Sequence, residues 1–143
     1  MSTERAPHSR LFDPADGLVD YNAVQVGEQL PHVGFLVTPA DVEEYRDAVG
    51  APKRRPTIAP MHLLALTLAA ITARMPLPAT CVHVGQEIEW RHAIEPSAPG
   101  TAITVRFALL SRRSAGDGTL AAFSLHLAAD GLGVARGRIL LQS

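Results

Sequence analysis

The stretch from Met61 to Ala73 constrains the fold of this chain more than any other feature. It reads Met-His-Leu-Leu-Ala-Leu-Thr-Leu-Ala-Ala-Ile-Thr-Ala, so a helix here is apolar on every side. Such a helix must be surrounded by protein or by lipid. It is too short to cross a bilayer, which takes about 20 residues. We therefore expect a buried central helix that begins at Pro60 and ends before Pro76.

A second helix is predicted from Pro39 to Val49. The tetrapeptide Thr38-Pro39-Ala40-Asp41 has the pattern of a capping box, with Thr38 as the N-cap and Asp41 reaching back to it. Gly50 follows as the expected end of the helix. Its polar composition predicts a position on the surface.

Segments of period two predict strands before and after the central helix. They are Gly34–Val37, Val82–Trp90, Ile103–Leu109, Ala121–Leu127 and Val134–Leu141. Asp130-Gly131 predicts a tight hairpin between the last two strands. On the second strand we expect Val82, Val84, Gln86, Ile88 and Trp90 to share one face. Such strands provide a curved antiparallel sheet that can wrap the helix, an α+β arrangement.

The chain of 143 residues is expected to form one domain, with an irregular arm over residues 1–23 and the folded domain over residues 24–143. The net charge of −1 gives no electrostatic reason to expect nucleic acid or an anionic membrane as a partner. The single cysteine, Cys81, cannot form an internal disulfide, and the N-terminus lacks the apolar run of a signal peptide. A cytoplasmic location is expected. The histidines have no metal-ligand spacing, so no metal site is expected.

The segment Val82–Trp90, with Ile94 and the turn at 96–100 after it, resembles the MaoC-like hotdog family, in particular its N-terminal-type, dehydratase-like members. Val26-Gly27-Glu28 and Ala59-Pro60 also match, and the resemblance covers about residues 24–142. It implies a hotdog fold and a dimer or double-hotdog assembly. It also implies action on acyl thioesters carried by coenzyme A or acyl carrier protein in polyketide or fatty acid metabolism. Family members hydrate enoyl thioesters, dehydrate 3-hydroxyacyl thioesters, or serve as non-catalytic partner subunits.

The chain departs from the catalytic members of that family ahead of the central helix. The (R)-specific hydratases carry a Gly-Asp-x-Asn-Pro-x-His-x-Asp-like loop, in which an Asp/His pair polarises water and moves its proton. Residues 49–56 here read Val-Gly-Ala-Pro-Lys-Arg-Arg-Pro. Residues 58–73 contain no Asp or Glu, although hotdog thioesterases commonly place a carboxylate there. The nucleophile is therefore open to alternatives, including an amine, which needs less activation than water.

His62 and Gln86 are the predicted catalytic residues. His62 lies in the first helical turn, where backbone N–H groups and the positive end of the helix dipole can hold a thioester carbonyl. Its imidazole can act as a base near neutral pH. The alternative is a helix-start histidine bonded to backbone. Gln86 interrupts an apolar strand face and so needs a buried partner, either to orient a carbonyl or water, or to satisfy a bulge in the strand.

Several further residues are predicted to bind substrate. Three of them, Pro60, Met61 and Leu63, lie at the start of the helix. Thr67 offers a hydroxyl, although a hydroxyl within a helix more commonly bonds to a carbonyl one turn earlier. Trp90 is predicted to form a wall of the acyl pocket, or else to lie in the core or at a dimer interface. The basic run Lys53, Arg54 and Arg55 is predicted to receive the pantetheine phosphate or an acidic carrier protein, or else to be a solvated loop.

The sequence thus predicts addition or elimination at the β-carbon of an enoyl or 3-substituted acyl thioester, in a homodimer with sites at the subunit interface. Thioester hydrolysis is a second enzymatic possibility. The competing class is a non-catalytic hotdog subunit that partners a catalytic dehydratase. No cofactor is expected beyond the pantetheine carrier of the substrate.

Overall fold

The computed structural model describes residues 17–50 and 57–143. A short 3-10 turn at Tyr21–Ala23 precedes two helices and five strands. These are β1 (Val33–Val37), α1 (Pro39–Val49), α2 (Pro60–Arg74), β2 (Val82–Trp90), β3 (Thr101–Ala115), β4 (Gly118–Ala129) and β5 (Leu132–Gln142). The predicted binding residues Lys53, Arg54 and Arg55 lie outside the described residues.

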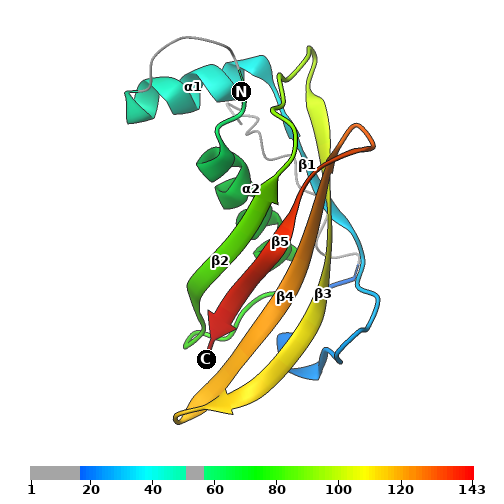
Figure 1. Ribbon diagram of the computed structural model, residues 1–143, viewed down its shortest axis with the longest axis vertical. Helices are drawn as coiled ribbons and strands as arrows, with labels where there is room; N and C mark the ends of the chain where they lie inside the picture. Colours follow the sequence, from blue (N-terminus) through cyan, green and yellow to red (C-terminus); the bar gives the residue numbers. More distant parts are fainter. Residues whose placement is uncertain (1–16, 51–56) are drawn as a thin grey trace, which may run out of the picture.

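The five strands form one antiparallel sheet in the order β1-β3-β4-β5-β2. The sheet curves, and α2 lies along one side of it (Figure 1). We call this side, which carries Phe107 and Leu125, the inner face. The opposite side, which carries Arg106 and His126, is the outer face. The predicted α+β architecture is confirmed.

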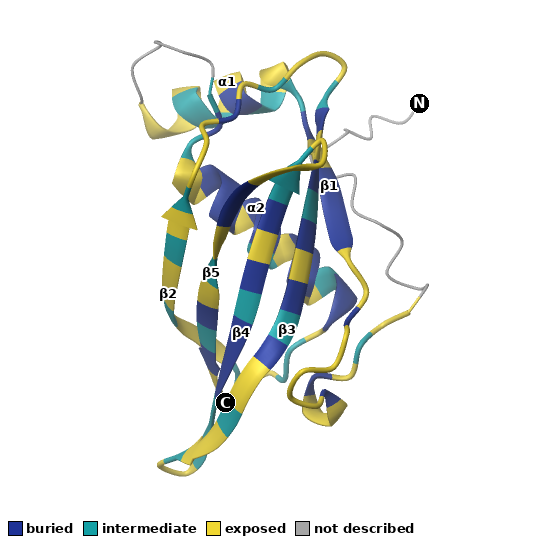
Figure 2. Ribbon diagram, turned by 45° about the vertical axis from the view of Figure 1, so that its right-hand side comes forward, coloured by how far each residue is buried: buried dark blue, intermediate teal, exposed yellow. Residues whose placement is uncertain are grey.

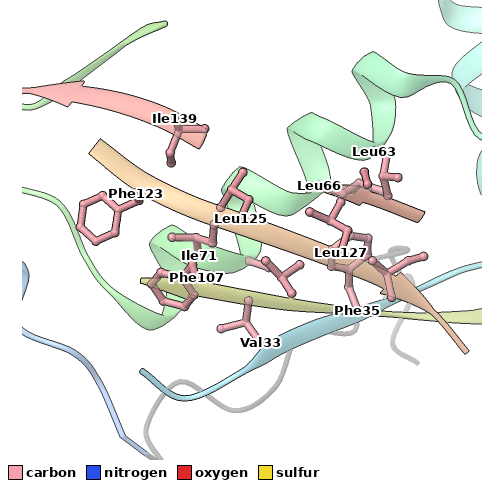
Figure 3. Packing of buried hydrophobic residues seen from close by; sticks show 14 of the residues in the cluster. Val33, Phe35, Leu63, Leu66, Ile71, Phe107, Phe123, Leu125, Leu127 and Ile139 are labelled. Carbon is pink, nitrogen blue, oxygen red and sulfur yellow. The ribbon is translucent and has the colours of Figure 1, made fainter. Parts of the chain in front are cut away.

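The core lies between α2 and the inner face of the sheet (Figure 3). Leu63 and Ile71 of α2 are almost completely buried. Burying each such side chain contributes about 1.5–3 kcal/mol. Alternate residues of the sheet meet them, as the period-two pattern predicted: Val33, Phe35, Phe107, Phe123, Leu125, Leu127 and Ile139.

The predicted boundaries of α1 are confirmed. The Asp41 N–H donates to the Thr38 hydroxyl at 3.1 Å, and the Thr38 N–H donates to the Asp41 carboxylate at 2.9 Å. The helix ends at Gly50, whose φ of 69° suits a residue without a side chain. As expected from its composition, Val42 is the only residue of α1 that is buried.

The predicted hairpin at Asp130-Gly131 is also confirmed. These two residues join β4 to β5 with positive φ angles of 47° and 88°. Positive φ at both central positions is typical of the turn that matches the twist of the two strands. The turn sets Ala129 opposite Leu132, and a bulge between Leu127 and Ala128 then shifts the register so that Leu127 lies opposite Ala135.

The expectation of a helix buried on every side is wrong. Met61 is 62% exposed, and Ala65 and Ala69 are exposed one and two turns further along α2. We call Met61, Ala65 and Ala69 the open stripe of α2. The reason is geometric, because a single five-stranded sheet curves around only part of the helix circumference. An apolar stripe therefore faces outward in the single chain.

The predicted face of β2 is wrong at its start. A bulge lies between His83 and Gly85, so His83 pairs with Leu141 and Val82 pairs with Gln142. One extra residue in a strand moves all residues before it to the other face. Val82 therefore does not share the inner face with Ile88 and Trp90.

Strand β2 forms one edge of the sheet, and β1 forms the other. None of its nine residues is buried, in contrast to the alternating pattern of β3 and β4 (Figure 2). An unpaired edge offers a row of N–H and C=O groups to another strand.

In the described part of the chain, no helix is both long and apolar enough to cross a membrane.

Gly137 holds β2 against β5. A Cβ atom at this position would collide with the Glu87 carbonyl oxygen and lie 2.8 Å from Ile88 Cα. We expect Gly137→Ala to lower the free energy of unfolding by about 1–3 kcal/mol, because backbone atoms must move to admit the methyl group. Urea unfolding measures the loss. Gly133→Ala is the matched control in the same strand, since no atom lies within 4 Å of its Cβ. Equal stability of the two variants would contradict the close approach.

Candidate functional site

A pocket of about 250 Å³ lies at the start of α2. It is formed where the first turn of the helix meets the end of β2 and the segment that follows. Its lining residues are Thr57, Ile58, Pro60, Leu63, Trp90, Arg91, His92, Ala93 and Ile94. Three predicted site residues, Pro60, Leu63 and Trp90, are thus brought together here. We call this the helix-start pocket.

Two short segments joined by a backbone hydrogen bond form part of the wall of the helix-start pocket. The Ile58 N–H donates to the Ile94 carbonyl at 2.9 Å, which joins the segment before α2 to the segment after β2. The side chains of Ile58 and Ile94 are both buried, and Trp90 is half-buried. The pocket therefore has apolar walls next to the positive end of a helix, a combination that suits an acyl chain with a polar carbonyl at its end.

The N–H groups at the helix start are fewer than the sequence suggested. Pro60 has no N–H, and the Leu63 N–H donates to the Ala59 carbonyl at 3.0 Å as the first bond of the helix. The Met61 N–H lies in the first turn, where helix geometry provides no acceptor within the helix. The Met61 N–H is therefore a candidate backbone donor at the helix start, although Met61 is not among the residues that line the helix-start pocket and its side chain belongs to the open stripe.

His62 points toward α1. Its side chain is 7% exposed, and its ring stacks on Tyr45 with the centroids 4.2 Å apart and the planes 2° from parallel. His62 is not among the residues that line the helix-start pocket. The structure thus places it at the start of the helix, as predicted, but in the packing between two helices. Its catalytic role stays a prediction.

His92 is the residue that the sequence reasoning missed. It is exposed and lines the helix-start pocket two residues after Trp90. An imidazole is the side chain best suited to accept or deliver a proton near neutral pH. Its sequence position at the end of a strand next to the apolar Trp90 and Ile94 was the available signal, because binding residues concentrate where loops leave a rigid sheet.

Gln86 lies on the inner face of β2 opposite Ile139. The side chain is exposed, so the expectation that it needs a buried partner is wrong. The reason is that α2 does not cover the inner face as far as the edge strand. Gln86 is not among the residues of the helix-start pocket.

Thr67 is completely buried, and its hydroxyl donates to the Leu63 carbonyl at 2.8 Å. Thr72 makes the same kind of bond to the Leu68 carbonyl at 2.9 Å. These are the back-bonds that hydroxyl side chains commonly make within helices. Thr67 is therefore a buried residue of α2 that does not line the helix-start pocket.

The remaining reactive groups do not extend the site. Burial raises the pKa of the Cys81 thiol, which disfavours the thiolate that a nucleophile would need. Across residues 17–50 and 57–143, no three His, Cys, Asp or Glu side chains are grouped in a way that could hold a metal ion. The polar side chains that line the helix-start pocket are those of Thr57, Arg91 and His92.

No protein-family model and no curated protein sequence matches this chain. Solved structures do. A monoamine oxidase regulatory protein from Archaeoglobus is similar at 12% identity, with a TM-score of 0.69, over 90% of this chain and 95% of that one. An (R)-hydratase from A. caviae involved in PHA biosynthesis is similar at 15% identity, with a TM-score of 0.63, over 83% and 96%. The HadBC (3R-hydroxyacyl-ACP dehydratase) complex from Mycobacterium tuberculosis contains a chain similar at 14% identity, with a TM-score of 0.55, over 79% and 92%. The chain has the hotdog fold.

The stack between Tyr45 and His62 is expected to stabilise the packing of α1 on α2. We expect Tyr45→Ala to lower the free energy of unfolding by about 1–2 kcal/mol, because it removes a stacked ring and exposes His62. Thermal or urea unfolding checks this. Val49→Ala is the control on the same helix, since Val49 is exposed, and it should change stability by less than about 0.5 kcal/mol. A Tyr45→Ala protein as stable as the control would show that the stack contributes nothing.

Proposed function

We propose that this chain acts on acyl thioesters carried by coenzyme A or acyl carrier protein, with the acyl group in the helix-start pocket. The observation that carries the proposal is the apolar pocket at the N-terminal end of a central helix, with the His92 imidazole among its lining residues. The similar structures support it, since they include an (R)-hydratase and a 3R-hydroxyacyl-ACP dehydratase. A MaoC-like relationship is part of the proposal.

The proposed reaction is addition to, or elimination from, the β-carbon. The lone pair of the nucleophile forms a bond to Cβ, and the π electrons of the Cα–Cβ bond move toward the thioester oxygen. The Met61 N–H would donate to that oxygen as its negative charge grows. Cα then takes a proton and the nucleophile loses one, so the product is the simple adduct. Elimination is the reverse sequence.

Two imidazoles are candidates for the proton transfer. His92 lines the pocket, whereas His62 is the residue predicted from the sequence and would need its stack with Tyr45 to open. Gln86 would orient the reacting groups only if a second subunit covers the inner face of β2. No Asp or Glu lines the described part of the pocket, so an amine nucleophile, or water activated by imidazole alone, fits the site best.

The enzymatic proposal is tested with a medium-chain 2-enoyl thioester, in water and with small amines, followed by mass spectrometry. We expect adduct formation, which falls about 100-fold or more in His92→Ala because general acid–base catalysis contributes roughly 10²–10⁴-fold. His62→Ala is assayed in parallel, and His83→Ala, an exposed histidine of β2, is the control. Release of free thiol in the same tubes would indicate hydrolysis instead. An intact thioester in every tube, with chain length and carrier varied, would contradict the enzymatic proposal.

The assembly we propose is a pair of hotdog domains. The open stripe of α2 leaves apolar side chains exposed in the single chain, and β2 is an unpaired strand edge without a buried residue. Exposed apolar surface of this kind is typical of an interface. A second copy of this chain is the simplest occupant. The HadBC complex shows that a similar chain also occurs in an assembly of two different subunits, which supports the alternative of a non-catalytic partner.

The interface is tested with Ala65→Arg. Ala65 is exposed in the single chain, so the variant should fold normally but bury a charge when two copies associate. We expect the wild type to sediment as a dimer and the variant as a monomer. Ala48→Arg, at an exposed alanine of α1, is the control. A wild-type monomer that associates only with a second, catalytic hotdog chain would favour the partner-subunit alternative.

A further inference from the structure

A row of charged side chains crosses the outer face of the sheet in exact cross-strand register. Arg106 of β3 lies opposite His126 of β4, His126 lies opposite Arg136 of β5, and Arg136 lies opposite Glu89 of β2. Residues that pair directly across strands project from the same face at close spacing. The row therefore places one arginine on each side of His126.

A groove of about 490 Å³ lies along this row. Its basic lining residues are Arg91, Arg106, Arg136, His126 and His32. Gly131 and Gly133 at the β4–β5 hairpin form another part of the lining, and the absence of side chains there leaves room for a ligand. We call this the outer groove.

The positive charge of the outer groove is only partly balanced. Arg136 donates to Glu89 at 2.9 Å, and this pair is exposed. Arg91 and Arg106 have no carboxylate within ion-pair distance in the described part of the chain, and no Asp or Glu is among the lining residues. Like charges directly opposite one another destabilise a sheet. An arrangement of this kind is stabilised when an anion binds between the arginines.

His126 responds to the same surroundings. Partial burial, followed by the positive charges of Arg106 and Arg136, lowers the pKa of its imidazole. Arg106 and Arg136 lie opposite it on the neighbouring strands, and the depression that His126 lines on its other side also contains Arg138, Glu87 and Glu89. A bound anion would offset the positive charges and raise that pKa again. His126 is therefore a built-in reporter of anion binding.

Arg91 connects the outer groove to the helix-start pocket, because it lines both. It follows Trp90 directly, and its N–H donates to the Val134 carbonyl at 2.8 Å, which holds the backbone at the rim of the sheet. An extended ligand can therefore place an apolar end beside Trp90 and an anionic end on the outer face without crossing the core.

We propose that the outer groove binds phosphate ester groups, and that these are the phosphates of the carrier arm whose acyl end occupies the helix-start pocket. The link to the acyl end rests on the proposed function, whereas anion binding in the groove rests on the arginines alone. The guanidinium groups of Arg91 and Arg106 would each make charge-assisted hydrogen bonds to phosphate oxygens.

The groove is tested by adding four probes to the full chain: coenzyme A, dephospho-coenzyme A, 4′-phosphopantetheine and phosphate-free pantetheine. Calorimetry gives affinities, and the NMR signals of the His126 imidazole report the location. We expect the first three to shift the His126 signals and pantetheine to leave them unchanged. Tighter binding of coenzyme A than of phosphopantetheine would identify the nucleotide as the source of the phosphates, and equal binding would identify the carrier-protein arm.

The matched variants are Arg106→Gln in the groove and Arg113→Gln, an exposed arginine further along β3. We expect Arg106→Gln to weaken coenzyme A binding about tenfold or more, because it removes a charge-assisted contact. Arg113→Gln should bind like wild type. Coenzyme A that binds equally well to both variants, or that leaves the His126 signals unmoved, would overturn the proposal.

A pH series distinguishes anion binding in the outer groove from anion binding to other positive charges on the surface. Inorganic sulfate keeps its charge between pH 6 and pH 8, so any change in its affinity comes from the protein. We expect sulfate affinity to rise as the pH falls, because protonated His126 adds a positive charge. His126→Gln should reduce this dependence, and His32→Gln is measured beside it because His32 lines the same groove. A pH dependence unchanged in His126→Gln would contradict the assignment of His126.

Failure of the groove and failure of the proposed function are distinguishable. If coenzyme A binding depends on Arg106 but no acyl thioester is turned over, the anion site is supported and the proposed enzymatic activity is contradicted. If turnover occurs with a KM that Arg106→Gln leaves unchanged, the enzymatic activity is supported and the outer groove is not part of the substrate site.

Discussion

Packing of the apolar helix α2 against one face of a curved sheet is the contact on which the other features depend. The sheet has to curve to follow the helix, and the helix start then lies beside the end of β2, where the pocket forms. The same contact explains what is left uncovered. One sheet reaches around part of α2 only, so the open stripe and the inner face of the edge strand stay exposed together.

The two faces of the sheet perform different tasks. Inner-face side chains such as Phe107, Phe123 and Leu125 are buried against α2 and provide most of the apolar burial. Outer-face positions alternate with them and carry the charged row. Because Arg91 lies at the rim where both faces end, the apolar pocket and the charged groove meet at a single residue. The arrangement offers a route for a ligand with one apolar end and one anionic end.

The sequence predicted the elements well, because they depend on local chemistry. The capping box at Thr38, the proline at position 60, the Asp130-Gly131 turn and the period-two strands each have a short-range cause. The site was harder to predict. The direction of His62 depends on Tyr45 in another helix, and the bulge after His83 depends on pairing with β5. Neither is visible in local periodicity, and His92 gained meaning only when the end of β2 met the start of α2.

If the helix-start pocket holds the acyl group, binding of a non-reactive acyl thioether of coenzyme A will change the NMR signals of the residues that line it. The methyl groups of Leu63 and Ile94 and the indole of Trp90 report from the pocket. The reference is Val26, which is exposed and lines neither the helix-start pocket nor the outer groove. We expect shifts at the three pocket residues that grow with acyl chain length while the Val26 signals stay unchanged. Chain-length-dependent shifts located elsewhere, with the pocket residues unmoved, would contradict binding of the acyl group in this pocket.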